Sequence, residues 1–183
     1  MGIWAGYLGG RWDHWIMRVA DVLFSFPSLL LAIFVMAILG ERTYNVVFAI
    51  GIVYIPQFAR ISRGAILTIK GSEFVRAARS NGASSGFILF RHLLPGFTSH
   101  IIVTLTLSVP GMILGETSLS FLGLGLRPPI VSWGVLLQDC MDIKVVKFYP
   151  WLLLPVIFIV LTVLCFNFLG DGLRDAADPY STR

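Results

Sequence analysis

The chain has 183 residues, of which 56% are hydrophobic and only 13% are charged, and its formal net charge is +4. In soluble domains about a quarter of the residues are charged, and the charges here cluster between long apolar runs. The composition therefore excludes an ordinary soluble domain. The mean hydropathy of +0.82 places the chain in a bilayer.

The opening stretch, residues 3–10, is apolar but too short to cross a membrane. It lacks the basic first region and the cleavage site of a signal peptide. We interpret it as the tail of a helix whose start is missing, so the sequence is expected to be truncated at its N-terminus.

Four apolar runs follow, and each can be compared with the roughly 20 residues that span a bilayer as a helix. They cover residues 22–39, 43–59, 92–115 and 148–170. A spanning helix satisfies its own backbone hydrogen bonds, as lipid demands, so the sequence predicts an all-α, polytopic membrane bundle in a single domain, residues 1–183. The second run is short and contains Pro56, and we keep it as a span because its flanks need opposite membrane faces.

The basic residues predict the orientation, since cytoplasmic loops hold the excess of Lys and Arg. If residues 60–91 are cytoplasmic, ten basic residues lie inside: Arg11, Arg18, Arg60, Arg63, Lys70, Arg76, Arg79, Arg91, Arg174 and Arg183. The remaining four lie outside: Arg42, Arg127, Lys144 and Lys147. The net charge therefore reflects membrane orientation and gives no case for nucleic-acid binding.

The cytoplasmic segment, residues 61–95, is predicted to form two short helices around a glycine elbow. Ser72 is suited to cap the first helix, which Glu73 in its first turn would stabilise through the helix dipole. The helical repeat places four residues on one face: Glu73, Arg76, Ala77 and Ser80. Gly82 can adopt the positive φ that ends such a helix.

The second short helix would be capped by Ser84 or Ser85, and it would carry apolar side chains, Phe87, Phe90 and Leu94, on one side. Pro95 cannot continue that helix but is suited to begin the next one.

The predicted extracytoplasmic segment, residues 122–149, contains Pro128 and Pro129, which end any helix, and Ser132, which can cap a short helix from Trp133. The preceding span ends near Glu116, a membrane-boundary acid that is either a functional group or an interfacial anchor. Ser118 and Ser120 could line a solute path, although small hydroxyl residues also serve helix packing.

Motifs for chemistry within the chain are missing from the sequence. His14, His92 and His100 form no ligand set, and Cys140 and Cys165 show no metal spacing. There is neither a phosphate-binding Gly-rich loop with Lys-Ser/Thr nor a hydrolase motif. We therefore expect no enzyme activity, no metal and no cofactor in this chain.

Residues 76–82, Arg-Ala-Ala-Arg-Ser-Asn-Gly, continuing to Leu94-Pro95, resemble the EAA loop of ATP-binding-cassette importer permeases. The Ala pair, the Gly and the Leu-Pro have the required spacing, while Arg76 replaces the acid and His92 replaces an Ile. Glu73, one turn earlier, is our candidate for the carboxylate. Further segments resemble the dipeptide, oligopeptide and nickel branch of these permeases, among them residues 5–10, 118–125, 132–134 and 167–175.

The resemblance implies the importer-permease (MetI-like) helical bundle in the inner membrane. It also implies a second permease subunit, cytoplasmic ATPases that bind ATP, an external solute-binding protein and surrounding lipid as partners. Carried over by position, the ATPase-docking residues are Glu73, Arg76, Ala77, Ala78, Gly82, Leu94 and Pro95. The expected cargo is a peptide or a similar small solute.

Two alternatives stay open at this point. An intramembrane enzyme would use Glu116 with a histidine, but His92 and His100 lie at the opposite end of that span. An ion-driven secondary transporter would favour acids at mid-membrane depth, and the four runs hold none there.

Overall fold

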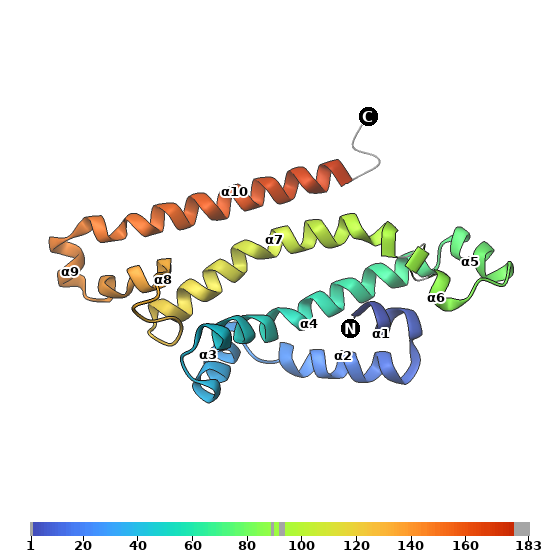
Figure 1. Cartoon of the computed structure of the whole chain (residues 1–183), viewed down its shortest axis with the longest axis horizontal. Helices are drawn as coiled ribbons and strands as arrows, with labels where there is room; N and C mark the ends of the chain where they lie inside the picture. The colour runs from blue at the N-terminus through green and yellow to red at the C-terminus, as the bar shows by residue number, and fades with distance from the viewer. Residues whose placement is uncertain (1, 89, 92–93, 178–183) are drawn as a thin grey trace. The chain divides into compact units, whose positions relative to one another are not determined.

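The computed structural model describes residues 2–88, 90–91 and 94–177, and every regular element within these ranges is a helix (Figure 1). His92 of the predicted loop lies outside the described residues. The elements are α1 (Gly2–Leu8), α2 (Gly10–Phe24), α3 (Ser28–Leu39), α4 (Thr43–Lys70), α5 (Glu73–Ser80), α6 (Ser85–Ile88), α7 (Leu94–Phe121), α8 (Trp133–Leu136), η2 (Gln138–Met141), α9 (Ile143–Phe148), η3 (Pro150–Leu153) and α10 (Leu154–Ala177). The all-α prediction is confirmed.

Three helical stretches of the described chain are long and apolar enough to cross a membrane: Thr43–Lys70, Phe97–Phe121 and Pro150–Ala177. The first contains the second predicted run, and the other two overlap most of the third and fourth. Helix α4 continues through Pro56 to Lys70, so residues 61–70, predicted as loop, extend the helix. The two short helices therefore begin directly beyond it.

The prediction of one continuous helix over residues 22–39 is wrong. Helix α2 ends at Phe24 and α3 begins at Ser28, with Pro27 between them. Proline disfavours helical backbone at the residue before it and has no N–H to donate, so the helix breaks there. The pair Gly10–Phe24 and Ser28–Leu39 is a fourth, interrupted candidate span.

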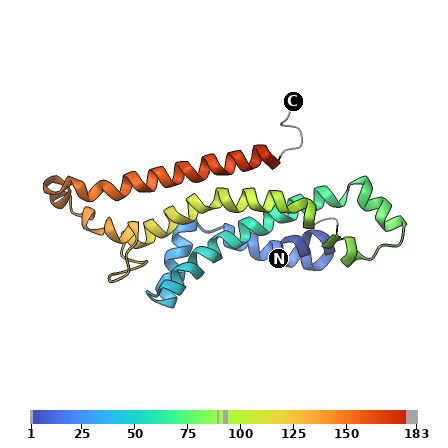
Figure 2. The same cartoon turned by 45° about the horizontal axis from the view of Figure 1, so that its top comes forward.

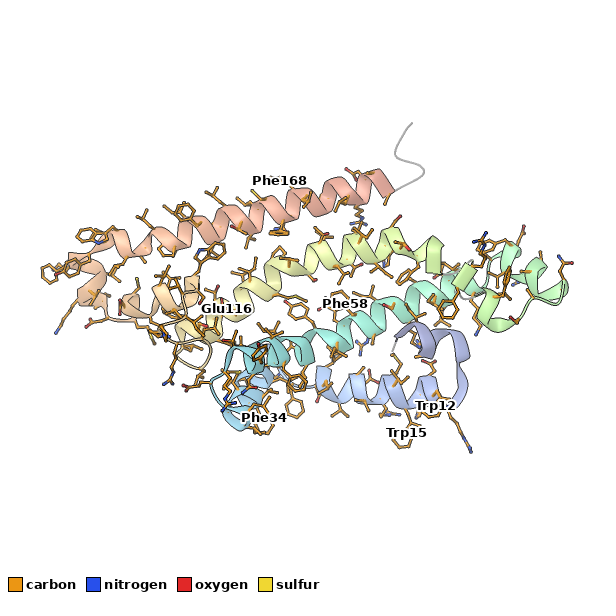
Figure 3. All side chains as sticks on the ribbon, in the orientation of Figure 1. Trp12, Trp15, Phe34, Phe58, Glu116 and Phe168 are labelled. Atoms are coloured by element: carbon orange, nitrogen blue, oxygen red, sulfur yellow. The ribbon has the colours of Figure 1, made fainter. Side chains whose placement is uncertain are left out.

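Large apolar side chains point outward from several helices, as Figure 3 shows for Trp12, Trp15, Phe34 and Phe168. Their exposed fractions are 71%, 68%, 63% and 73%. Water would not support so many exposed apolar side chains on one chain. These helix faces are therefore suited to contact with lipid.

The chain divides into two compact units, and α4 and α7 contribute residues to both. The first unit comprises Met1–Ser25 and Tyr54–Ile102, and the second comprises Phe26–Val53 and Val103–Arg183.

In the first unit, α1 lies beside α2 (Figure 2) and packs closely on α4. A Cβ atom at Gly6 would lie 3.1 Å from the Arg63 carbonyl oxygen and 3.3 Å from Ile66 Cγ2, and Ala5 is fully buried. Small residues thus allow the backbones to approach, as is usual between membrane helices.

Ion pairs join α2 to α4 in the same unit. Arg63 binds Asp13, and Arg60 binds Asp21 at 2.7 Å. The guanidinium carbon of Arg60 also lies 4.2 Å from the centre of the Phe24 ring, a distance suited to a cation–π contact.

In the second unit, the turn between α3 and α4 is closed by Gly40, whose φ is +81°, and by Asn45. The Asn45 amide donates to the carbonyls of Leu39 and Gly40 at 2.7 and 2.9 Å. Arg127, beyond the end of α7, forms an ion pair with Glu41 of this turn. The basic-residue count placed both segments on the extracytoplasmic side, and the ion pair is consistent with that assignment.

Candidate functional site

The predicted glycine elbow is present between α5 and α6. Gly82 has φ of +77°, and the N–H of Ala83 donates to the Ala78 carbonyl at 3.1 Å, as in a Schellman helix ending. The Ser84 hydroxyl accepts from the Phe87 N–H at 3.3 Å, so Ser84 caps α6 as predicted. At the start of α5, the Ser72 carbonyl accepts from Arg76 N–H at 3.2 Å.

A small apolar cluster fixes the elbow to the end of α4. It is centred on Ile66 of α4, Val75 of α5 and Ile88 of α6, which are 0%, 1% and 0% exposed. Partly buried side chains surround it: Ile3, Ile69, Ala78 and Ala83. Because one side chain of each helix meets in this cluster, α5 and α6 are held against α4.

The opposite side of α5 faces outward. Glu73, Arg76, Ala77 and Ser80 are all exposed, so the face predicted from the helical repeat is free to meet a partner. Ala78, assigned to the same docking set, packs instead against the buried cluster. Leu94 and Pro95 form the first turn of α7. The docking role of these residues stays a prediction.

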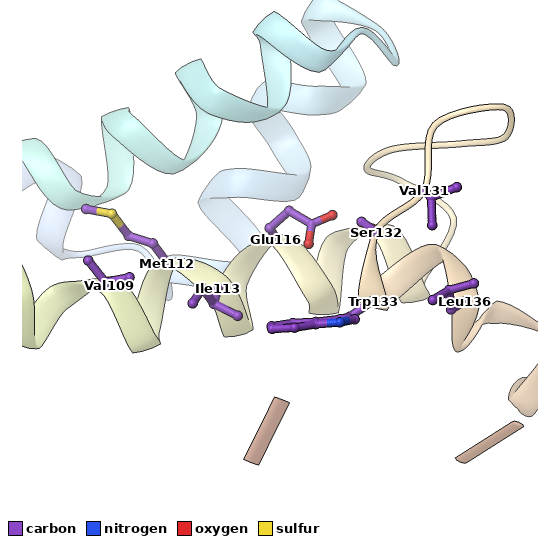
Figure 4. A pocket seen from close by; sticks show the side chains of 8 residues that line it. All are labelled: Val109, Met112, Ile113, Glu116, Val131, Ser132, Trp133 and Leu136. Carbon is purple, nitrogen blue, oxygen red and sulfur yellow. The ribbon is translucent and has the colours of Figure 1, made fainter. Parts of the chain in front are cut away.

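The second unit contains an open cavity of about 540 Å³ beside α7 (Figure 4). Its lining comes from one face of α7 and from the segment around α8: Val109, Met112, Ile113, Glu116, Val131, Ser132, Trp133 and Leu136. The hydroxyl of Ser132 caps α8 by accepting from Val135 N–H at 3.2 Å, which confirms the predicted short helix.

Of the three residues predicted for a solute path, only Glu116 lines this cavity. Its Oε1 accepts a hydrogen bond from the Ser120 hydroxyl at 2.6 Å. Ser120 is fully buried, and its hydroxyl oxygen also accepts from Leu126 N–H at 2.9 Å. The Ser118 hydroxyl donates to its own helix, at the Leu114 carbonyl.

Two glycines allow the segment after α7, which was predicted to be extracytoplasmic, to pack on the end of that helix. A Cβ at Gly125 would lie 2.5 Å from Ser120 Oγ, and one at Gly134 would lie 2.5 Å from the Thr117 carbonyl oxygen. Gln138 adds a hydrogen bond to the Ser120 carbonyl at 2.5 Å. Ser120 is therefore a packing centre, which the sequence analysis had left open.

Sequence reasoning missed the walls of the cavity, although a signal for them existed. Val109, Met112, Ile113 and Glu116 follow the three- and four-residue spacing of one helix face. Trp133 follows the Ser132 cap directly. Among the described residues, no three His, Cys, Asp or Glu side chains gather as a metal site would require.

Comparisons with known proteins place these features among transport proteins. A family model described as "Binding-protein-dependent transport system inner membrane component" matches residues 1–182. The glutathione transport system permease protein GsiD of Shigella dysenteriae is 49% identical over 173 residues, which cover 94% of this chain and 57% of that protein. GsiD of Salmonella typhimurium is 50% identical over 168 residues, 92% of this chain and 55% of that protein. The chain thus spans little more than half the length of these relatives.

Proposed function

Because the chain belongs to the family of binding-protein-dependent transport system inner membrane components, we propose that it is the membrane-spanning permease subunit of an ATP-binding-cassette importer. In this role it forms part of the solute path and couples to a separate ATPase. The observation that carries the proposal is the elbow of α5 and α6, which is anchored on α4 by Ile66, Val75 and Ile88 and presents a polar face outward.

That outward face is the proposed docking surface for the ATPase. Glu73 and Arg76 supply its charges, Ala77 supplies a small side chain for close approach, and Gly82 supplies the bend. The buried cluster behind the face transmits a displacement of α5 to α4, because close-packed apolar contacts yield little. Ala78 acts from behind the surface by packing on the buried cluster, and Leu94 and Pro95, at the start of α7, complete the proposed docking segment.

The proposed partners are a second permease subunit, cytoplasmic ATPases, an extracytoplasmic solute-binding protein and lipid. Outward apolar side chains such as Phe34 and Phe168 support contact with lipid and a second subunit. ATP is bound by the partner ATPases, and this chain itself needs no cofactor and catalyses no reaction.

The proposed cargo is a small peptide or a peptide-like solute. The names of the similar permeases specify glutathione transport, and we extend that substrate class to this chain.

Reconstitution tests the proposal. Vesicles are reconstituted with the permease and with the ATPase and second permease encoded by neighbouring genes. The secreted binding protein and labelled glutathione or dipeptides are then added. Uptake should require both ATP and the binding protein. Uptake driven by an ion gradient without ATP would contradict the importer assignment.

A further inference from the structure

The cavity beside α7 combines one carboxylate with apolar and aromatic walls. We propose that it binds a primary ammonium group of the solute, such as the free amino terminus of a short peptide, with Glu116 as the charge partner. The proposal rests on the importer function proposed above and adds the chemical class that the path selects.

The Glu116 carboxylate is held in one orientation. Ser120 donates its single hydroxyl proton to Oε1 at 2.6 Å, and the Ser120 oxygen is itself fixed by the Leu126 N–H at 2.9 Å. Within the described chain, Glu116 has no ion pair. One carboxylate oxygen therefore remains for a donor that enters the cavity.

The remaining walls favour a cation with apolar neighbours. Five aliphatic or thioether side chains and the Trp133 indole line the cavity together with Glu116 and Ser132, and no Lys or Arg is among the lining residues. A cation near an indole face gains cation–π attraction, and its attraction to a carboxylate is stronger where water is partly excluded. A carboxylate of the solute would instead be repelled by Glu116.

The place of the cavity in the topology agrees with this role. Glu116 lies near the C-terminal end of α7, which ends at Phe121, and the basic-residue count assigns this end to the extracytoplasmic side. A solute released by an external binding protein would meet this cavity early in its passage.

Binding can be measured at Trp133 without any transport. The permease, purified in detergent with the subunits that accompany it, is labelled with 5-fluorotryptophan, and the Trp133 resonance is assigned from its loss in Trp133→Phe. The probes are alanyl-leucine amide, which carries one ammonium group and no carboxylate, and its N-acetyl derivative. The free amine should shift the Trp133 resonance in a saturable way, and the acetylated probe should not.

Substitutions then test the charge. Glu116→Gln keeps an acceptor for Ser120 but removes the charge, and it should weaken binding of the free amine about tenfold or more, since hydrogen bonds to charged groups are worth that much. Ser118→Ala is the matched control: it lies on the same helix, its hydroxyl bonds to Leu114, and it should bind like the parent.

Each outcome decides the proposal. Equal shifts with both probes, or none with either, would refute ammonium recognition, and the parent protein alone gives that answer if Glu116→Gln does not fold. Unchanged binding in a folded Glu116→Gln variant would make Glu116 an interfacial anchor. Failure of the importer assignment would show separately, as uptake that is independent of ATP.

Discussion

Arg63 of α4 holds Asp13 of α2 through two parallel hydrogen bonds, with Nε to Oδ1 at 2.5 Å and Nη2 to Oδ2 at 2.6 Å. The two side chains are 34% and 16% exposed. The second ion pair between these helices, Arg60 with Asp21, has one contact and is 52% and 53% exposed. Bidentate, partly buried pairs are the stronger kind, so Asp13 and Arg63 form the main polar tether between α2 and α4.

Removing this tether should loosen α2. Asp13→Ala is expected to destabilise the purified protein by about 1–2 kcal/mol, since a charged hydrogen-bonded pair is lost, whereas Asp21→Ala should cost less than about 1 kcal/mol. Thermal unfolding in detergent measures both. A double-mutant cycle with Arg63→Ala should show coupling, and equal effects at Asp13 and Asp21 would contradict the ranking.

The elbow prediction concerns Gly82. A Cβ there has no atom within 4 Å, so the cost of a substitution comes from its φ of +77° alone. Gly82→Val should strain the turn, because β-branched residues disfavour positive φ, while Gly82→Asn should be tolerated, because Asn adopts this conformation more readily.

The measurement for Gly82 is co-purification of the ATPase from detergent. Gly82→Val should insert in the membrane at near-normal levels but lose the ATPase, and Gly82→Asn should retain it. The exposed neighbour Asn81, changed to Ser, is a further control. If Gly82→Val binds the ATPase like the parent, the elbow is only a connector.

The packing of the predicted extracytoplasmic segment against α7 implies a loss of stability when Gly134 is substituted. Gly134→Ala would bring a methyl group to 2.5 Å from the Thr117 carbonyl oxygen and 2.7 Å from Ser120 Cβ, and overpacking of this kind costs about 1–3 kcal/mol. The segment should detach more often, so trypsin added to spheroplasts should cut sooner at Lys144 or Lys147, neither of which precedes a proline. Gly172→Ala, where nothing lies within 4 Å, should leave cleavage unchanged.

The two cysteines report the topology. Cys140 lies in the predicted extracytoplasmic segment, half-buried, with its Sγ donating to the Leu152 carbonyl at 3.5 Å. Cys165 lies within the candidate span Pro150–Ala177. A charged, membrane-impermeant maleimide on spheroplasts should label Cys140, and only a lipid-soluble maleimide should reach Cys165.

Burial should make the labelling of Cys140 slow. A cysteine placed at the exposed neighbour Asp139, in a Cys140→Ser background, should react faster with the same reagent. Labelling of Cys140 only after lysis would overturn the orientation derived from the basic residues.

The sequence was most informative where local chemistry decides structure. The apolar runs predicted the helices, and the single residues Gly82, Ser84 and Ser132 predicted an elbow and two caps, because backbone conformation and capping depend on a few neighbouring residues. The outward face of α5 followed from helical spacing in the same way.

Contacts between distant segments were beyond that reasoning. Asp13 and Arg63 are 50 positions apart, and no spacing rule pairs them. Ser120 could be a path residue or a packing residue from the sequence alone, and only the approach of Gly125 and Gly134 makes it buried. Ala77 and Ala78 were assigned together to the docking surface. Because successive residues of a helix point in different directions, Ala77 is exposed while Ala78 packs against the buried cluster.

The two sides of α5 are free to change independently. Val75 and its apolar neighbours determine whether the elbow folds, while Glu73, Arg76 and Ala77 contribute nothing to that cluster. Selection can therefore change the outer surface at little cost in stability, and under the proposed docking role such changes would alter the choice of ATPase. A related importer could then bind a different ATPase by exchanging a few exposed side chains of α5, with the buried cluster unchanged.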